Sequence, residues 1–361
     1  MNKFNSIIAV AFLAVTFTAC KKNTDEPIVV VPPSDGSTLT LNGLIAAEAG
    51  SAAGNSVYVD FSTDKQTSLA RDSWDLGFYS GADFKVILNS TNGASALLLK
   101  DKTDLNSVTS ADFDPNALKV GQGQGNLTLV DDAREANITN RTAIAAISAT
   151  EAENKVYIIN RKGGSGTVLA NEELYKIRVI RIGTTGYTLQ YAKIAETTFK
   201  TLDITKNTDA NFQFASLVNG AAVTAEPAKA SWDLVWGYSM YWTTSKDVNG
   251  NTIYLPYAFS DLVFINNLGG TSAAIVTITD TKTYASFSES NIAGETFLTN
   301  RDAIGSGWRS TQPATGVNTK VFYLIKDTAG NVYKLKFISM GAGDAGTRGK
   351  PVIEYKLIKK G

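Results

Sequence analysis

The chain has 361 residues and carries 34 acidic and 34 basic side chains, so its formal net charge is zero. This balance gives no electrostatic reason to bind nucleic acid or an anionic membrane surface. The chain has no histidine and one cysteine. Ser-His and Cys-His catalytic pairs, histidine-containing metal sites and internal disulfides are therefore excluded. We predict a protein that binds a ligand and is not an enzyme.

The N-terminus has the pattern of a lipoprotein export signal. Lys3 gives a positive start, and residues 7–15 form an apolar run that is too short to span a bilayer. Phe17-Thr18-Ala19-Cys20 matches a lipobox, in which the cysteine thiol is alkylated with a diacylglyceryl group and becomes the new N-terminus. We expect residues 1–19 to be a signal peptide and Cys20 to carry acyl chains such as palmitate. The alternative is an ordinary cleaved signal with an unrelated cysteine.

Residues 20–38 form a candidate tether behind the lipidated cysteine. Three of the eight prolines lie in this segment together with charged, Gly and Ser residues, a composition typical of linkers. In an extended form it reaches roughly 55 Å. We expect it to hold the folded part clear of the outer membrane, exposed on the cell surface.

Repeated motifs indicate an internal duplication. Ser73-Trp74-Asp75-Leu76 recurs as Ser231-Trp232-Asp233-Leu234, an offset of 158 residues. The apolar segment that contains Tyr175 recurs around Tyr333 with the same offset of 158. Two motifs in one order at one offset are not readily explained by chance.

A third motif lies between the other two. Thr139-Asn140-Arg141 recurs as Thr299-Asn300-Arg301, at an offset of 160. We therefore predict two copies of one domain, residues 39–199 and residues 200–361. No Pro/Gly-rich linker separates them, so we expect the copies to pack together.

Within each copy the pattern is that of β-strands, and we predict an all-β fold with little helix. The predicted strands are alternating or β-branched and aromatic runs bounded by Gly, Asn, Asp and Ser. Val248-Asn249-Gly250 has the composition of a hairpin turn. Short helices are expected over residues 131–136 and in the Asn-Arg segments. The strongest predicted strands are Val57–Phe61, Phe84–Leu88, Tyr175–Val179 and Tyr333–Phe337.

These motifs carry a resemblance to a known family. The Ser-Trp-Asp-Leu segments, the strands around Tyr175 and Tyr333, and the closing segment of residues 350–357 resemble the HmuY family of bacterial surface lipoproteins. The resemblance covers most of both copies and implies an all-β fold for each. It also implies capture of haem or a related porphyrin, with a possible outer-membrane receptor or transporter as partner. Haem-binding relatives use histidine or methionine as axial ligands, and this chain has no histidine.

Met240 and Met340 are the only methionines beyond the initiator, and a thioether is a soft ligand for haem iron. Alternate positions from Trp232 to Trp242 would lie on one face of a strand, where rings can stack on a flat ligand. The same stripe also suits the core face of a sheet, and both methionines could be packing residues. The first copy keeps only the start of the stripe, so its far end is the variable part.

Phenolate is another known haem ligand, and several tyrosines lie in the same region. We take Tyr238 and Tyr241 as further candidates for haem binding. The candidate aromatic platform consists of Trp236, Trp242, Tyr254 and Tyr257.

Two other functional classes remain open. A glycan or a protein could bind the aromatic face without any metal. An enzyme would need carboxylates, lysine or tyrosine, but no spacing indicates a catalytic pair of carboxylates. We interpret the recurring Asp75 and Asp233 as acceptors of backbone N–H groups at turns.

Overall fold

Twenty β-strands and a set of short 3-10 turns form the regular structure of residues 31–361, which are the residues that the computed structural model describes. The longest 3-10 turn is Glu289–Gly294. The prediction of an all-β fold is confirmed. Within the same residues, no helix is long and apolar enough to cross a membrane.

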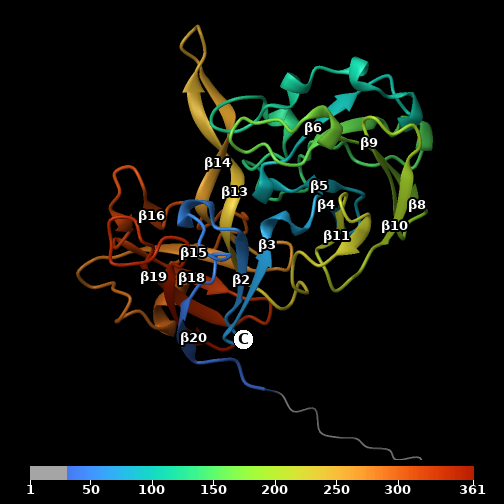
Figure 1. The fold of residues 1–361 in the computed structure, drawn as a ribbon. Coiled ribbons are helices and arrows are strands. Elements are labelled where there is room, and N and C mark those ends of the chain that lie inside the picture. Colours follow the sequence, from blue (N-terminus) through green and yellow to red (C-terminus); the bar gives the residue numbers. More distant parts are fainter. Residues whose placement is uncertain (1–30) are drawn as a thin grey trace, which may run out of the picture. The chain divides into compact units, whose positions relative to one another are not determined.

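Four antiparallel sheets contain most of the strands, and Figure 1 shows them in two groups. The first group, lobe A, contains a five-stranded sheet of β1 (Gly36–Thr40), β20 (Val352–Lys359), β19 (Val332–Ser339), β18 (Val321–Lys326) and β15 (Ser272–Thr277). It also contains a four-stranded sheet of β14 (Thr252–Ile265), β13 (Leu234–Lys246), β2 (Asn55–Asp60) and β3 (Lys65–Ala70). A small ribbon of β16 (Arg309–Ser310) and β17 (Gly316–Val317) lies in the same half of the chain.

The second group, lobe B, has the same arrangement. Its five-stranded sheet consists of β10 (Lys200–Thr205), β9 (Gly186–Lys193), β8 (Tyr175–Ile182), β7 (Val156–Asn160) and β6 (Ser95–Leu99). Its four-stranded sheet consists of β12 (Ala221–Val223), β11 (Phe212–Ser216), β4 (Leu76–Tyr79) and β5 (Val86–Leu88).

Each lobe has a separate hydrophobic core between its two sheets. In lobe A, Leu234 and Trp236 of the four-stranded sheet pack with Leu335 and Tyr355 of the five-stranded sheet. In lobe B, the corresponding cluster joins residues of β4 and β5 to residues of β7, β8 and β9. Alternation of apolar and polar residues along the strands places these side chains on the inner faces.

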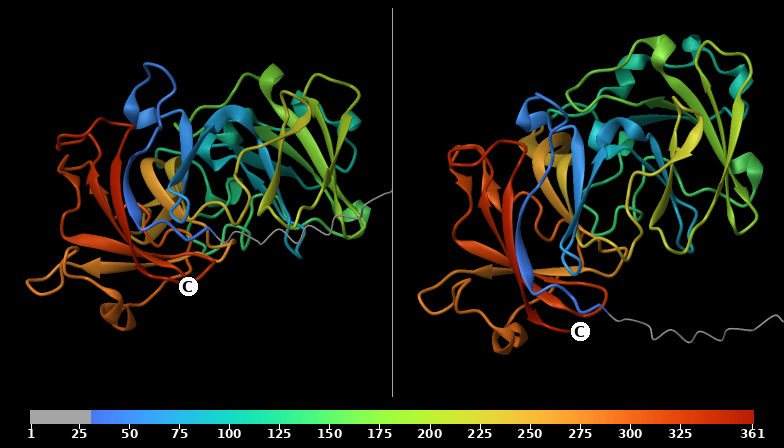
Figure 2. Two further views of the ribbon diagram at one scale, coloured as in Figure 1. Left: turned by 90° about the horizontal axis from the view of Figure 1, so that it is seen from below. Right: turned by 60° about the horizontal axis from the view of Figure 1, so that its bottom comes forward.

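Each lobe contains strands from both halves of the chain. β2 comes early in the chain, yet it pairs with β13 of lobe A through Val59 and Leu234. β11 comes after the last strand of the first half, yet it pairs with β4 of lobe B through Phe214 and Gly77. The early strand β1 pairs with the final strand β20, and Figure 2 shows these two strands side by side. The domain boundary at residue 199/200 stays a prediction that rests on the repeated motifs. Each lobe combines strands from both sides of this boundary.

Asp75 and Asp233 each form a hydrogen bond to the backbone next to a strand from the other half of the chain. The Asp75 carboxylate accepts a hydrogen bond from the backbone N–H of Leu217 at 2.7 Å, directly after β11. The Asp233 carboxylate accepts one from the N–H of Phe61 at 2.9 Å, directly after β2. Both carboxylates are buried. The interpretation of these residues as acceptors of backbone N–H groups at turns is confirmed.

The predicted short helices at residues 131–136 and in the Asn-Arg segments are wrong, because these stretches form turns. The Asp132 carboxylate accepts a hydrogen bond from the N–H of Arg134 at 3.1 Å, and the Asn137 amide oxygen accepts one from the N–H of Thr139 at 3.0 Å. Such local bonds from Asp and Asn compete with helix formation.

Replacing Asp75 tests how much its contacts next to β11 stabilise the fold. Asp75 also forms a 2.7 Å ion pair with Arg161, and both side chains are largely buried. We expect Asp75→Ala to lower the free energy of unfolding by about 3 kcal/mol, because it leaves a buried cation and the Leu217 N–H without a partner. Urea unfolding followed by tryptophan fluorescence measures the loss.

The neighbouring ion pair of Asp72 and Lys162 provides the control. Its two atoms are 3.8 Å apart and both side chains are at least half exposed. Asp72→Ala should therefore cost less than about 1 kcal/mol. Equal losses in the two variants would contradict a special role for Asp75.

Candidate functional site

The hairpin of β13 and β14 contains the two longest strands of the described structure and projects beyond both lobes (Figure 1). Its tip is the predicted turn: the Asp247 carboxylate accepts hydrogen bonds from the N–H groups of Asn249 and Asn251, and Gly250 has a φ of 82°. A β-bulge places Ser260 and Asp261 opposite Tyr238, where Asp261 adopts a φ of 56°. The bulge separates the base of the hairpin from its projecting part.

The base of the hairpin belongs to the core of lobe A. Trp236 is 1% exposed and lies in the same cluster as Trp308 and Tyr323. The structure therefore places this member of the predicted platform where no ligand at the surface reaches it. Its indole is fixed by packing within the sandwich.

The two methionines lie in different clusters. Met240 is 2% exposed and packs with Val120, Leu127 and Val130, which belong to a segment of the first half of the chain. Met340 is fully buried in the core of lobe A. A site in which both thioethers bind one iron is not formed in this conformation.

The remaining platform residues lie on the projecting part of the hairpin, with Trp242 and Tyr254 on one face and Tyr257 on the other. Trp242 and Tyr254 are 5.5 Å apart between ring centroids, in an edge-to-face arrangement, and Tyr254 is 45% exposed. Tyr257 lies 5.0 Å from Phe259, which in turn lies 5.7 Å from Tyr241. We call these five residues the hairpin aromatics. Apart from the exposed Tyr254, each is half-buried, so they present ring surface to solvent.

The two tyrosines predicted to bind haem iron retain their protons. The Tyr241 hydroxyl donates a 2.6 Å hydrogen bond to the Asp302 carboxylate, and burial together with this carboxylate raises the pKa of Tyr241. Burial also raises the pKa of Tyr238, although the Arg71 guanidinium lies 4.7 Å from its ring centroid. A neutral phenol is a weaker iron ligand than a phenolate, so neither residue is prepared for that role.

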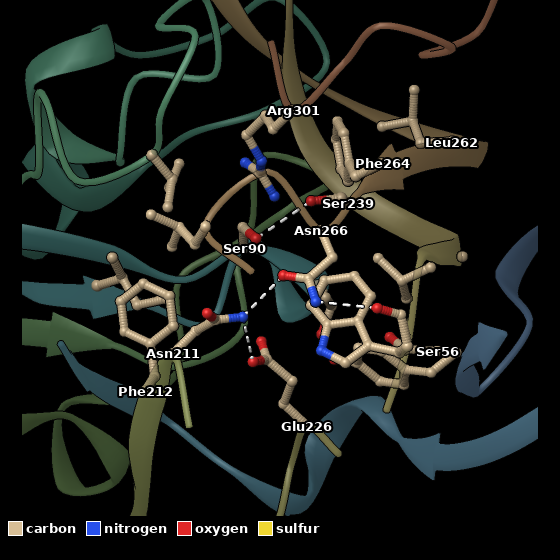
Figure 3. A pocket seen from close by; sticks show the side chains of 18 of the residues that line it. Ser56, Ser90, Asn211, Phe212, Glu226, Ser239, Leu262, Phe264, Asn266 and Arg301 are labelled. Carbon is tan, nitrogen blue, oxygen red and sulfur yellow. Dashed lines mark hydrogen bonds between the residues drawn. The ribbon is translucent and has the colours of Figure 1, made fainter. Parts of the chain in front are cut away.

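A cavity of about 100 Å³ lies below the hairpin, and residues of both four-stranded sheets line it (Figure 3). Its apolar wall is largely aromatic and includes Trp74, Phe214 and Trp232. Pockets for drug-sized ligands have volumes of roughly 300 Å³ or more. The cavity is therefore too small for a porphyrin.

A series of hydrogen bonds links polar residues that line this cavity. The Asn211 amide donates to Glu226 and to Asn266, each at 2.9 Å, and the Asn266 amide donates to the Trp232 carbonyl at 2.9 Å. Burial raises the pKa of Glu226 to about 8. Arg301 enters the cavity from the opposite side, as Figure 3 shows.

Sequence reasoning did not identify Glu226 or Arg301 as site residues. Arg301 was visible only as part of a repeated motif, and no pattern indicated Glu226. Among residues 31–361, no group of three or more carboxylate, cysteine or histidine side chains is arranged to hold a metal ion.

Comparison with known proteins gives one family. The family described as HmuY protein matches residues 52–355, most of the chain. The chain belongs to the HmuY family. No curated protein matches it. Among solved structures, the crystal structure of apo PinO from Porphyromonas gingivitis shows 17% identity, covers 54% of this chain and 96% of the other, and has a TM-score of 0.14.

The raised pKa of Glu226 predicts a dependence of stability on pH. A carboxyl with a pKa of about 8 in the folded state and about 4 in the unfolded state favours folding at low pH, and this contribution is lost as the pH rises through 8. We expect Glu226→Gln, which cannot ionise, to raise the free energy of unfolding at pH 9 by up to about 5 kcal/mol. Near pH 4 the two proteins should be nearly equal.

Urea unfolding at pH 4, 6, 8 and 9 measures this difference. Asp209→Asn, at an exposed position outside the cavity, is the control and should leave the pH dependence unchanged. A variant at Glu226 that follows the wild-type pH dependence would contradict the raised pKa.

Proposed function

We propose that this HmuY family protein is a surface protein that binds haem or a related porphyrin on the projecting part of the β13–β14 hairpin. It acts by binding and not by catalysis. Trp242 and Tyr254, which share one face of the hairpin, supply the contact surface, because flat rings stack on aromatic side chains. A receptor or transporter in the outer membrane would take up the captured ligand.

The observation that carries this proposal is the length of the hairpin. In lobe B the Asn89 amide donates to the Trp74 carbonyl, 15 residues earlier. In lobe A the Asn266 amide makes the same bond to the Trp232 carbonyl, 34 residues earlier. The hairpin in lobe A is therefore longer by 19 residues between equivalent points, and the added length bears the hairpin aromatics.

The iron ligand would come from the same hairpin. Met240 lies in one cluster with Trp242, so its thioether is the candidate closest to the platform. Exposing it would require the segment around Leu127 to move. Met340 is enclosed in the core of lobe A and does not take part.

Equivalent contacts in the two lobes also support the proposal of two copies of one domain. Lys176 and Lys334 are both buried, and each donates to backbone carbonyl groups: Lys176 to Val108 at 2.8 Å and Lys334 to Tyr284 at 2.6 Å. These lysines are 158 residues apart, the offset of the repeated motifs. In this proposal each copy gives its first three strands to the other.

Titration with haemin tests the binding proposal. We expect a Soret shift with wild-type protein at micromolar concentration and at least a tenfold weaker affinity in Trp242→Ala/Tyr254→Ala, because stacking surface is lost. Met240→Ala should change the position of the Soret band if the thioether binds iron. Tyr79→Ala, at the end of the shorter hairpin of lobe B, is the control and should bind as wild type.

The absence of a Soret shift in both redox states would contradict haem binding. The exposed rings of the platform would then favour the second candidate, a module that contacts glycan or protein. Binding on a glycan array that is lost in Trp242→Ala would support this candidate.

We further propose that residues 1–19 are removed as a signal peptide and that Cys20 is lipidated, which would hold the protein at the outer membrane. These residues lie outside the part that the structure describes. The family assignment supports the proposal, since the resemblance implies surface lipoproteins.

Replacing Cys20 tests the anchor. We expect Cys20→Ser to lose labelling by radioactive palmitate and to leave the membrane fraction, because no other thiol is available. Cys20→Ser protein that stays in the membrane fraction and is still labelled would contradict this proposal.

A further inference from the structure

Arg301 is a partly buried cation without an ion-pair partner in the described structure. Its Nη1 atom is buried and has no hydrogen-bond partner, and among residues 31–361 its guanidinium forms no ion pair within 4.0 Å. The guanidinium lies 4.0 Å from the centroid of the Phe264 ring. Stacking on this ring holds the planar group but satisfies none of its donors. The buried Nη1 donor carries a desolvation cost unless another molecule accepts a hydrogen bond from it.

The equivalent arginine of the first copy has the partner that Arg301 lacks. Arg141 occupies the same place in the repeated Thr-Asn-Arg motif and forms a 3.0 Å ion pair with the Asp132 carboxylate. Asp131 and Asp302 act electrostatically on Arg301, but neither pairs with it directly. The Asp302 carboxylate instead accepts the hydrogen bond from Tyr241.

The cavity provides room for a carboxylate beside Arg301. Arg301 points into it, with Asn266 between Arg301 and Glu226 (Figure 3). A cavity of about 150 Å³ accommodates benzene, which has six heavy atoms. At about 100 Å³, this cavity suits a molecule of about four heavy atoms.

We propose that this cavity binds a small organic carboxylate, of the size of acetate, through Arg301. The planar guanidinium matches a carboxylate in a two-point arrangement. The aromatic wall of the cavity encloses the alkyl end. This site is separate from the hairpin platform and does not depend on porphyrin binding.

Titration with sodium acetate tests the site, with chloride used to keep the ionic strength constant. Trp74 and Trp232 line the cavity, so their fluorescence and saturation-transfer NMR of the acetate methyl group report binding. We expect saturable binding of acetate, at least tenfold weaker binding of the uncharged isostere acetamide, and no binding of the larger benzoate.

Two substitutions and a matched control locate the contact. Arg301→Gln should weaken acetate binding at least tenfold, and Arg301→Lys, which keeps the charge but loses the planar fork, should weaken it less. Arg141→Gln changes the equivalent arginine, whose side chain is 49% exposed, and should bind acetate as wild type. If Arg301→Gln does not fold, Arg301→Lys decides the matter alone.

Three results would overturn the proposal. The first is the absence of a saturable acetate signal, which would mean that the cavity holds water only. The second is equal binding of acetate and acetamide. The third is wild-type affinity for acetate in the Arg301 variants. Haemin titration of Arg301→Lys separates the two sites: an unchanged Soret response together with weakened acetate binding identifies an independent cavity.

Discussion

The buried carboxylates of Asp75 and Asp233 hold together a structure in which neither half of the chain completes its own sheets. Each carboxylate binds the backbone directly after a strand that comes from the other half. Because these bonds are buried, losing one exposes an unsatisfied polar group to an apolar interior. These two side-chain contacts add to the backbone pairing that places β2 beside β13 and β11 beside β4. The cavity and the base of the hairpin are formed by the sheets that these contacts align.

The same framework supports different surfaces in the two lobes. Equivalent lysines, asparagines and aspartates make equivalent hydrogen bonds in both lobes, so the two lobes have the same type of β-sandwich. The difference is concentrated in one hairpin and in the surroundings of one arginine. Substitution at exposed loops and hairpins leaves a core intact, and functional sites are commonly found there. The two lobes thus share their packing and differ in the surface that one hairpin presents.

Much of the fold could be predicted from the sequence. The alternating runs around Val57, Tyr175 and Tyr333 are strands, and the turn at Gly250 closes the hairpin as expected. Alternation identifies which face of a strand is buried, but not which sheet it joins, so the exchange of strands was not predictable. The site was predicted less well. Met240 and Trp236 have the composition of a ligand face, yet the segment around Leu127 and the core of lobe A cover them. Arg141 and Arg301 lie in matching motifs, and only the spatial position of a carboxylate distinguishes them.

The pairing of β1 with β20 links the beginning of the folded region to its end. The Tyr355 hydroxyl bonds the Asp64 carboxylate at 2.6 Å, across 291 residues of sequence. Contacts of such long range form slowly, because the intervening chain must first be brought together. Lobe A cannot be completed until the last strand has emerged from whatever machinery synthesises or exports the chain. Until that moment β1 has no strand partner, and its unpaired edge is exposed to other chains. During maturation β1 therefore stays unpaired for the whole time needed to deliver β20.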